Sequence, residues 1–277
     1  MEVKRIFDLL PYHLETFKPK DDVIAGKDNG VWVKYSIHEY IDAVNNVSYG
    51  LLALGLKKGD TIASITTNRP EWNFIDMGAQ QIGVIHIPIY PTISQEDYKY
   101  IFTHAEVKYV FVTGQELLRK MENIVPQVPT IKAIYTFKNL RGFNHLNELI
   151  ELGKDNSNPQ LLEELKASIT EDDIPTIIYT SGTTGTPKGV MLSHKNIISN
   201  FKVISYIPKF GEEENVLSFL PLCHIYERMM NYLYHYRGFS IYYLDNLAYI
   251  VDFVNEVKPA MMTAVPRLIE KLYAKII

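Results

Sequence analysis

The chain has 277 residues, enough for one large α/β domain or two ordinary ones, and it is 47% hydrophobic and 22% charged, which excludes a disordered or low-complexity protein. Its formal net charge is -4 and no run of basic residues offsets it locally, so nucleic acid is not an expected partner. The single cysteine excludes an internal disulfide.

The N-terminal residues indicate neither a secretory signal nor a membrane anchor. Acidic residues at positions 2, 8 and 15 interrupt the apolar ones, which the apolar region of a signal peptide would not tolerate. Nowhere do about 18 uncharged apolar residues follow one another, as a membrane-spanning helix requires. We therefore expect a cytoplasmic protein. Peripheral contact with the inner membrane surface and assembly into a homodimer stay open.

The first clear element is a helix that begins after Ser36. Ser36 and Glu39 have the spacing of a capping box, in which each side chain bonds the backbone amide of the other residue. Apolar residues then recur at helical spacing from Ile41 to Leu54, and Gly55 ends the helix. The β-branched run at residues 61–66 is predicted to be a strand.

Helix and strand patterns continue to alternate along the chain. Helices are expected at 72–81 and after Ser94, and strands at 84–89, 107–112, 131–136, 176–180, 216–220, 240–244 and 260–265. Such an order predicts an α/β fold of largely parallel, doubly wound sheets with helices on both faces.

The polar stretch at 153–158, followed by the acidic residues 170–173, is the best internal boundary. It divides the chain into a first sub-sheet region, residues 1–170, and a second region, residues 171–277. The second region is expected to hold the phosphate-loop strand and the start of a second sub-sheet.

The most informative segment follows the strand at 176–180. Residues 181–189 read Ser-Gly-Thr-Thr-Gly-Thr-Pro-Lys-Gly, so glycines, hydroxyls and a lysine come together. Glycines allow a tight turn and a close approach to a ligand, and successive amides and hydroxyls donate to oxyanions. An ordinary P-loop is excluded, because Pro187 precedes Lys188 and Gly189 follows it. Turn chemistry alone is the competing interpretation of such a loop.

Residues 179–190 resemble the AMP-binding signature of the adenylate-forming superfamily. This resemblance implies that the loop holds the β- and γ-phosphates of ATP, with Thr183, Thr184 and Lys188 making the contacts. The nucleotide-binding residues that it implies are Thr180, Ser181, Gly182, Thr183, Thr184, Gly185, Thr186, Lys188 and Gly189.

A second motif favours one branch of that superfamily. Residues 220–228, Leu-Pro-Leu-Cys-His-Ile-Tyr-Glu-Arg, resemble the core motif of long-chain fatty acyl-CoA synthetases, as do residues 68–72, 87–92 and 265–271. The resemblance implies a catalytic role for His224 near the carboxylate and the α-phosphate. A satisfied structural histidine is the alternative.

Other residues of these motifs are weaker candidates. Tyr226, Glu227 and Arg267 are predicted to line the substrate site, although the glutamate and the arginine also suit a helix cap, an ion pair or a covering role. Cys223 is expected to be a small packed residue and not a nucleophile, since adjacent residues on extended chain point to opposite faces. The aromatic residues between 232 and 243 are expected in the core.

The resemblance implies an ATP-dependent long-chain fatty acid–CoA ligase that uses ATP, Mg²⁺ and coenzyme A and acts on a fatty acid. It also implies parts not found in residues 1–277: a Tyr-Gly-x-Thr-Glu segment for adenine and Mg²⁺, a ribose-binding aspartate and a C-terminal lid domain with a catalytic lysine. We therefore expect a truncated N-terminal portion with weak activity or none. An adenylating ligase for another acid and a non-catalytic nucleotide- or acyl-binding module are the competing hypotheses.

Overall fold

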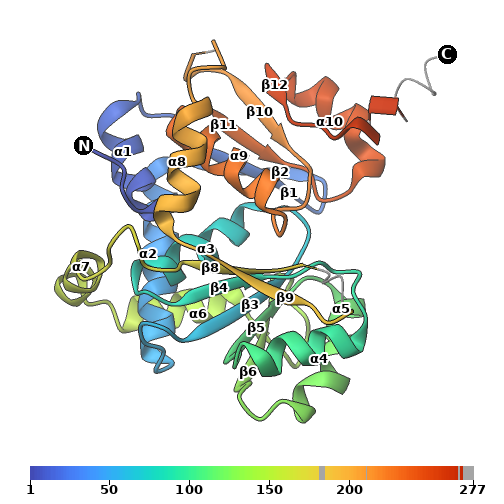
Figure 1. Ribbon diagram of the computed structural model, residues 1–277. Helices are drawn as coiled ribbons and strands as arrows, with labels where there is room; N and C mark the ends of the chain where they lie inside the picture. The colour runs from blue at the N-terminus through green and yellow to red at the C-terminus, as the bar shows by residue number, and fades with distance from the viewer. Residues whose placement is uncertain (181–184, 210, 268, 271–277) are drawn as a thin grey trace.

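The computed structural model describes residues 1–180, 185–209, 211–267, 269 and 270. They form a mixed α/β fold with two largely parallel sheets, as the sequence predicts. One sheet has seven strands in the order β7-β6-β5-β3-β4-β8-β9, and the other has five in the order β12-β10-β11-β1-β2. Figure 1 shows the five-stranded sheet above the seven-stranded one.

The seven-stranded sheet takes its strands from the middle of the chain. They are β3 (Thr61–Ile65), β4 (Ile85–Pro88), β5 (Tyr109–Val112), β6 (Ala133–Thr136), β7 (Asn144–His145), β8 (Thr176–Thr180) and β9 (Lys188–Leu192). All neighbours are parallel except β8 and β9, which form an antiparallel hairpin at the edge.

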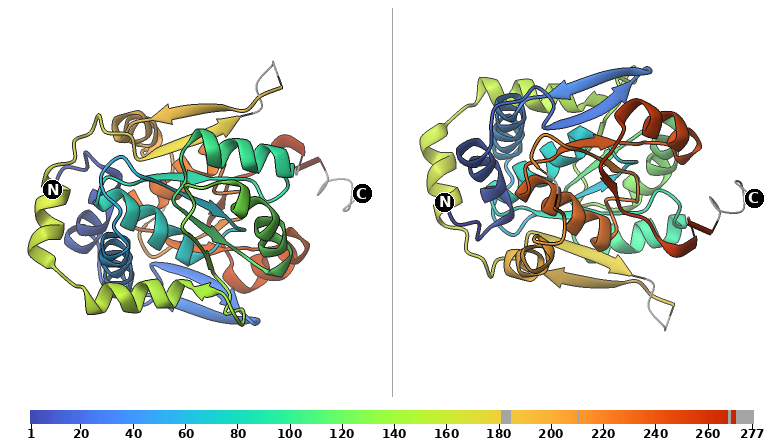
Figure 2. Two further views of the ribbon diagram at one scale, coloured as in Figure 1. Left: turned by 90° about the horizontal axis from the view of Figure 1, so that it is seen from below. Right: turned by 90° about the horizontal axis from the view of Figure 1, so that it is seen from above.

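The five-stranded sheet joins the two ends of the described chain. Its strands are β1 (Ile24–Asp28), β2 (Val31–Tyr35), β10 (Asn215–Ser218), β11 (Ser240–Tyr243) and β12 (Met261–Met262). β1 is parallel to β11, and β2 closes this edge as an antiparallel hairpin with β1. In both views of Figure 2, the β1–β2 and β8–β9 hairpins point to the end of the molecule opposite Met1.

Helices cover both faces of each sheet. The longer ones are α1 (Leu9–Thr16), α2 (Ile37–Ala53), α3 (Pro70–Gln81), α4 (Gln95–His104), α5 (Gln115–Ile124), α6 (Leu146–Asp155), α7 (Pro159–Ala167), α8 (His194–Ile204), α9 (Ile225–Tyr236) and α10 (Ile250–Val257). Short 3-10 turns lie at Ile6–Asp8, Val125–Gln127 and Leu247–Tyr249.

Three apolar clusters define the layers. The largest lies between the sheets and contains buried residues of α1, α2, α3 and α9. A second joins the outer face of the seven-stranded sheet to α4 and α5, and a third joins the outer face of the five-stranded sheet to α10. Helix α3 packs on both β4 and β1, so it lies between the two sheets.

The predicted capping box at Ser36 is confirmed. The amide of Glu39 donates to Ser36 Oγ at 3.3 Å, and the Ser36 amide donates to Glu39 Oε2 at 2.8 Å. Hydroxyl caps also start α4 at Ser94 and α8 at Ser193. These local bonds satisfy amides that have no partner within the helix, which is why sequence alone locates the helix starts.

The predicted boundary near residue 170 does not separate the two sheets. Strand β8, in the second predicted region, pairs with β4 of the first, and β1 and β2 belong to the sheet of β10–β12. Gly153 is not in a linker either, because it lies in α6, where a Cβ would come within 1.8 Å of the Asn46 carbonyl oxygen of α2. Strand pairing over long sequence distances overrides the local signal of polar composition.

Candidate functional site

The predicted phosphate loop connects β8 to β9. Thr180 lies opposite Lys188 in the hairpin register, and Tyr179 lies opposite Gly189. Residues directly opposite in an antiparallel pair have their side chains on the same face, so Thr180 and Lys188 flank one side of the loop. Strand β9 was not predicted from the sequence; it leads into α8, which begins after the cap residue Ser193.

Two glycines of this hairpin are required by geometry. Gly185 has a φ of 86°, in the left-handed region that favours glycine. A Cβ on Gly189 would lie 2.9 Å from a methyl carbon of Ile177 and 3.2 Å from the Tyr179 ring. Thr180, Thr186 and Lys188 are exposed. The predicted residues Ser181, Gly182, Thr183 and Thr184 lie outside the described residues.

The second motif forms the turn from β10 into α9. His224 is exposed and caps α9, since its Nδ1 accepts from the amide of Tyr226 at 3.3 Å. An accepting Nδ1 carries no proton, so in this arrangement the ring proton is on Nε2. The ring centroid of His224 is 6.5 Å from that of Tyr90, near the end of β4.

A cavity of about 130 Å³ brings the loop and this turn together. Its lining includes Thr180, Gly185 and Pro187 from the hairpin, Tyr90 from the β4 end, and Cys223 from the turn. Burial raises the pKa of the Tyr90 hydroxyl to about 12, so this group is a neutral donor at physiological pH. The loop and the 220–228 motif therefore both contribute to this cavity, the second motif through Cys223, whereas Lys188 and His224 are not among its lining residues.

Cys223 is a packed residue, as predicted. It is buried, and burial raises the pKa of its thiol to about 12. Since the thiolate and not the thiol is the nucleophile, Cys223 is inert at neutral pH.

The three predicted substrate-lining residues have different positions. Tyr226 is 41% exposed and Arg267 is exposed, so either remains accessible to a ligand. Glu227 is fully buried, and its carboxylate accepts from Ser218 at 2.6 Å and Thr263 at 2.7 Å. In this structure, Glu227 therefore belongs to the core and not to a cavity wall, because two hydroxyls occupy its oxygens.

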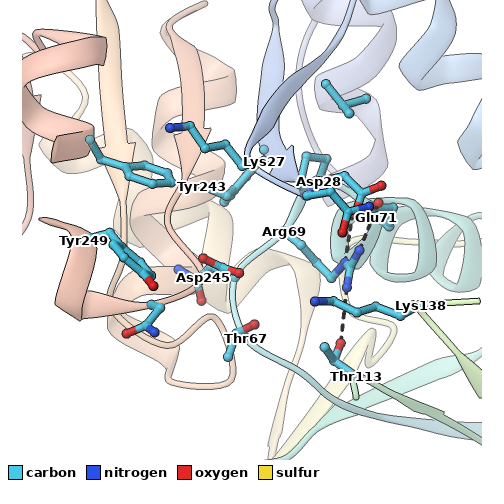
Figure 3. A pocket seen from close by; sticks show the side chains of 18 of the residues that line it. Lys27, Asp28, Thr67, Arg69, Glu71, Thr113, Lys138, Tyr243, Asp245 and Tyr249 are labelled. Atoms are coloured by element: carbon cyan, nitrogen blue, oxygen red, sulfur yellow. Dashed lines mark hydrogen bonds and ion pairs between the residues drawn. The ribbon is translucent and has the colours of Figure 1, made fainter. Parts of the chain in front are cut away.

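A larger cavity, of about 820 Å³, was not predicted. It lies where carboxyl ends of strands from both sheets face each other, with Thr67, Thr113 and Lys138 on one side and Asp245 and Tyr249 on the other (Figure 3). The available signal was topological: β4 and β5 lie on opposite sides of β3, and crevices form where the strand order reverses in this way.

Charged side chains line much of the larger cavity. Five acidic residues and three basic ones line it: Asp28, Glu71, Asp245, Asp252 and Glu256 against Lys27, Arg69 and Lys138. Two of the bases are already paired, because Arg69 bonds both oxygens of Glu71 at 2.9 and 3.1 Å and Lys27 lies 2.7 Å from Glu256. The lining of the larger cavity therefore carries a surplus of carboxylates, and the smaller cavity is lined, among the described residues, by one acidic residue, Asp97, and by no basic residue.

A buried constellation in the core has the order of a catalytic triad. His86 Nε2 is 2.7 Å from Ser64 Oγ, and His86 Nδ1 is 2.7 Å from Asp76 Oδ1. All three side chains are at most 1% exposed, and none lines the cavities described above. A nucleophile must reach its substrate, so we assign this set to the core.

The described residues give no site for a metal and no span for a membrane. No group of three or more histidine, cysteine, aspartate or glutamate side chains among them lies close enough to hold a metal ion. Within the same part of the chain, no helix is long and apolar enough to cross a bilayer.

Comparison with known proteins identifies a family. Residues 15–276 match the model of the AMP-binding enzyme family. The chain is 32% identical over 258 residues to the peroxisomal long chain acyl-CoA synthetase 6 of Arabidopsis thaliana, covering 89% of this chain and 36% of the relative. It is also 32% identical over 265 residues to the long-chain-fatty-acid–CoA ligase ACSBG2 of Xenopus laevis, covering 91% and 36%.

Solved structures agree on the fold. The anthranilate CoA ligase AuaEII, in complex with anthranoyl-AMP, superposes with a TM-score of 0.81 at 20% identity, covering 93% of this chain and 49% of that one. At this identity, the likeness concerns the fold alone. The chain spans about a third of the length of the curated relatives above.

Proposed function

The chain belongs to the AMP-binding enzyme family, and on that premise we propose that the protein is an ATP-dependent long-chain fatty acid–CoA ligase. In the first step, a carboxylate oxygen attacks the α-phosphorus of ATP and pyrophosphate leaves. In the second, the thiol sulfur of coenzyme A attacks the acyl carbon and AMP leaves. Because the chain covers 36% of the relatives compared above, both steps are proposed for the whole protein.

The observation that supports this proposal is the meeting of the β8–β9 loop and the His224 turn at one cavity. Adenylyl transfer to a carboxylate needs a group that holds the leaving pyrophosphate and a group that orients the carboxylate, a few ångströms apart. The loop suits the first task and the turn suits the second.

The residues have distinct proposed roles. Lys188, exposed on β9 and opposite Thr180, places a positive charge beside the departing pyrophosphate. Thr180, Gly185, Thr186 and the loop amides donate to phosphate oxygens. His224 Nε2–H donates to the carboxylate or to the α-phosphate, while its Nδ1 remains bonded to the Tyr226 amide.

The acid preference, the use of magnesium and the location of the protein do not rest on this cavity. The preference for long-chain acids rests on the names of relatives at about a third identity. Magnesium accompanies ATP in most phosphoryl chemistry, but no carboxylate cluster suited to it occurs among the described residues, so we assign it no step. A cytoplasmic location stays a prediction, and one relative carries the word peroxisomal in its name.

Acid-dependent exchange between ATP and pyrophosphate tests the proposal. The full-length protein and this chain are assayed side by side with acetate, octanoate, palmitate and a panel of amino acids. We expect palmitate to drive exchange in the full-length protein and this chain to show little. Exchange driven by amino acids or acetate would overturn the substrate class. Binding of ATP without exchange for any acid would favour a non-catalytic module.

A further inference from the structure

Two adjacent residues of the 220–228 motif connect helix α9 to different sheets. Glu227 accepts from Ser218, the last residue of β10, and from Thr263, just beyond β12. Arg228 donates to Thr176, the first residue of β8, and to Asp76 of α3. Glu227 and Arg228 are both fully buried. The first turn of α9 is therefore bonded to both sheets at once.

The guanidinium of Arg228 uses each of its three nitrogens. Its Nε donates to the Tyr232 hydroxyl at 2.7 Å, one Nη donates to Thr176, and the other pairs with Asp76. The Arg228 guanidinium also lies 5.2 Å from the centre of the Trp72 ring. A planar fork with several fixed donors can make all these contacts, whereas a lysine ammonium at the same place cannot.

Asp76 completes the network on the side of the seven-stranded sheet. It accepts from Arg228, from the Tyr232 hydroxyl at 2.6 Å and from His86, which reaches Ser64 of β3. Burial raises the pKa of Asp76, but the charge of Arg228 and the bonds from His86 and Tyr232 outweigh it and lower that pKa to about 2. Asp76 is thus ionised, and β3, β4, β8, α3 and α9 share one ion-paired centre.

Asn68 fixes the turn itself. Its amide donates to Ser218 Oγ at 3.2 Å and to the Leu220 carbonyl at 2.7 Å, and its oxygen accepts from the Leu222 amide at 3.2 Å. Ser218 in turn donates to Glu227. The motif at 68–72 therefore supplies Asn68 to the turn and Trp72 to Arg228, which explains physically why two motifs distant in sequence occur together.

Arg228 is connected to both parts of the candidate site, the loop that follows β8 and the His224 turn. Strand β8 starts at Thr176 and ends at Thr180, where the loop begins. The backbone amide of Arg228 donates to the His224 carbonyl at 3.1 Å, so Arg228 lies one helical turn from His224. A change at Arg228 thus acts on the loop strand through one bond and on the His224 turn through another.

We propose that Glu227 and Arg228 are positioning residues that set the separation between the β8–β9 loop and the His224 turn. The proposal rests on the proposed function, because the two parts would align ATP and the carboxylate. Neither side chain needs to touch substrate. Arg228 sets the position of the seven-stranded sheet, and Glu227 sets that of the five-stranded sheet.

Arg228→Lys in the full-length protein tests the proposal, since it keeps the charge beside Asp76 and removes the fork. Arg5→Lys is a matched control: Arg5 also bonds an aspartate, Asp8, through two nitrogens and a backbone carbonyl through the third, at the other end of the chain. Amide hydrogen exchange is followed in both variants. We expect exchange at residues 176–180 and 222–226 to rise about tenfold in Arg228→Lys and to stay unchanged in Arg5→Lys.

Catalysis gives the second measurement. In Arg228→Lys, we expect kcat for palmitate-dependent pyrophosphate exchange to fall about 100-fold with KM for palmitate within about threefold, because a misplacement of about 1 Å can cost that much. Glu227→Leu removes the acceptors of Ser218 and Thr263 and is expected to lower kcat about tenfold, whereas Glu227→Gln still bonds both hydroxyls and is expected to stay within about threefold of the wild type. An unchanged kcat in a folded Glu227→Leu variant would exclude the positioning role of Glu227. Arg5→Lys should keep the wild-type rate.

The outcomes separate the two proposals. If Arg228→Lys is folded and leaves both amide exchange and kcat unchanged, the positioning role is wrong. If the same loss of kcat occurs in Arg5→Lys, the effect is general destabilisation and the positioning role is also wrong. If the wild type shows no acid-dependent exchange while Arg228→Lys still loosens residues 176–180 and 222–226, the proposed function fails and the positioning role remains.

Discussion

Thr180 and Lys188 are paired directly across the β8–β9 hairpin, so the two ends of the phosphate loop are fixed to each other by the strand ladder. The position of the Lys188 backbone is consequently set by β-sheet hydrogen bonds and not by the loop sequence. The Lys188 side chain itself is exposed. Under the proposed function, the fixed backbone keeps this lysine at the edge of the loop, where its charge would meet that of the leaving pyrophosphate.

Lys188→Met should reduce palmitate-dependent pyrophosphate exchange of the full-length protein about 100-fold, because it removes the charge beside the leaving pyrophosphate. Since Lys188 is exposed, we expect the free energy of unfolding to change by less than about 0.5 kcal/mol. Lys195→Met, an exposed lysine on the following helix, is the control and should keep the rate. Equal rates for the two variants would exclude Lys188 from the site.

Glu227 should make the stability of the chain depend on pH. Burial raises the pKa of this carboxyl from 4.5 to about 7, against the bonds from Ser218 and Thr263. The folded chain therefore holds the proton more tightly than the unfolded one. The stabilisation is complete below pH 4.5 and is lost as the pH rises to about 7, and it amounts to about 3 kcal/mol.

Glu227→Gln removes the titrating carboxyl, so the difference in stability between the wild type and this variant reports the titration of Glu227 alone. We expect the free energy of unfolding of the wild type, relative to the variant, to fall by about 3 kcal/mol between pH 4.5 and pH 8 in urea titrations. Buried histidines such as His194, whose pKa is lowered to about 4 mainly by burial, titrate in both proteins and cancel. A difference that does not change with pH would contradict the prediction.

Cys223 should resist alkylation in the folded chain. Its pKa rises from 9.0 to about 12, so at any pH below 9 the thiolate is about 1,000-fold rarer than for an unperturbed thiol. Mass spectrometry after treatment with iodoacetamide at pH 8 measures the rate, and the same chain in urea is the control. Equal rates in the two conditions would show that the thiol is exposed or activated.

Gly153→Ala should destabilise the chain by about 3 kcal/mol, because the added methyl would collide with the Asn46 carbonyl oxygen at 1.8 Å and force α6 away from α2. Lys154→Ala is the control, since Lys154 lies on the same helix and its side chain is 53% exposed. Chemical denaturation measures both. Similar losses for the two variants would contradict close packing at Gly153.

Local signals in the sequence locate most elements and the phosphate loop. Ser36 and Glu39 cap α2, and the run Thr176–Thr180 is strand β8 as predicted, because caps and short β-branched runs act within a few residues. The β1–β2 hairpin was missed, although Asn29 and Gly30 form its turn with φ values of 49° and 83°. An Asn-Gly turn between apolar runs is a strong hairpin signal.

Contacts between residues far apart in the sequence could not be predicted from local sequence patterns. No periodicity indicates that Arg228 pairs with Asp76, 152 residues away, or that β1 lies beside β11. Glu227 was expected at the substrate because motifs mark residue types and not the direction of a side chain. The helical rotation of about 100° per residue turned it towards Ser218 and Thr263.

The pairing of β1 with β11 also has a consequence for synthesis. Ile24 is the register partner of Ile241, which is translated 217 residues later. At a ribosomal rate of about 5 to 20 residues per second, β1 waits about 10 to 40 s for its neighbour. The edge of β1 that faces β11 in the folded chain therefore stays without its strand partner for that time, and its free backbone groups are open to pairing with another chain.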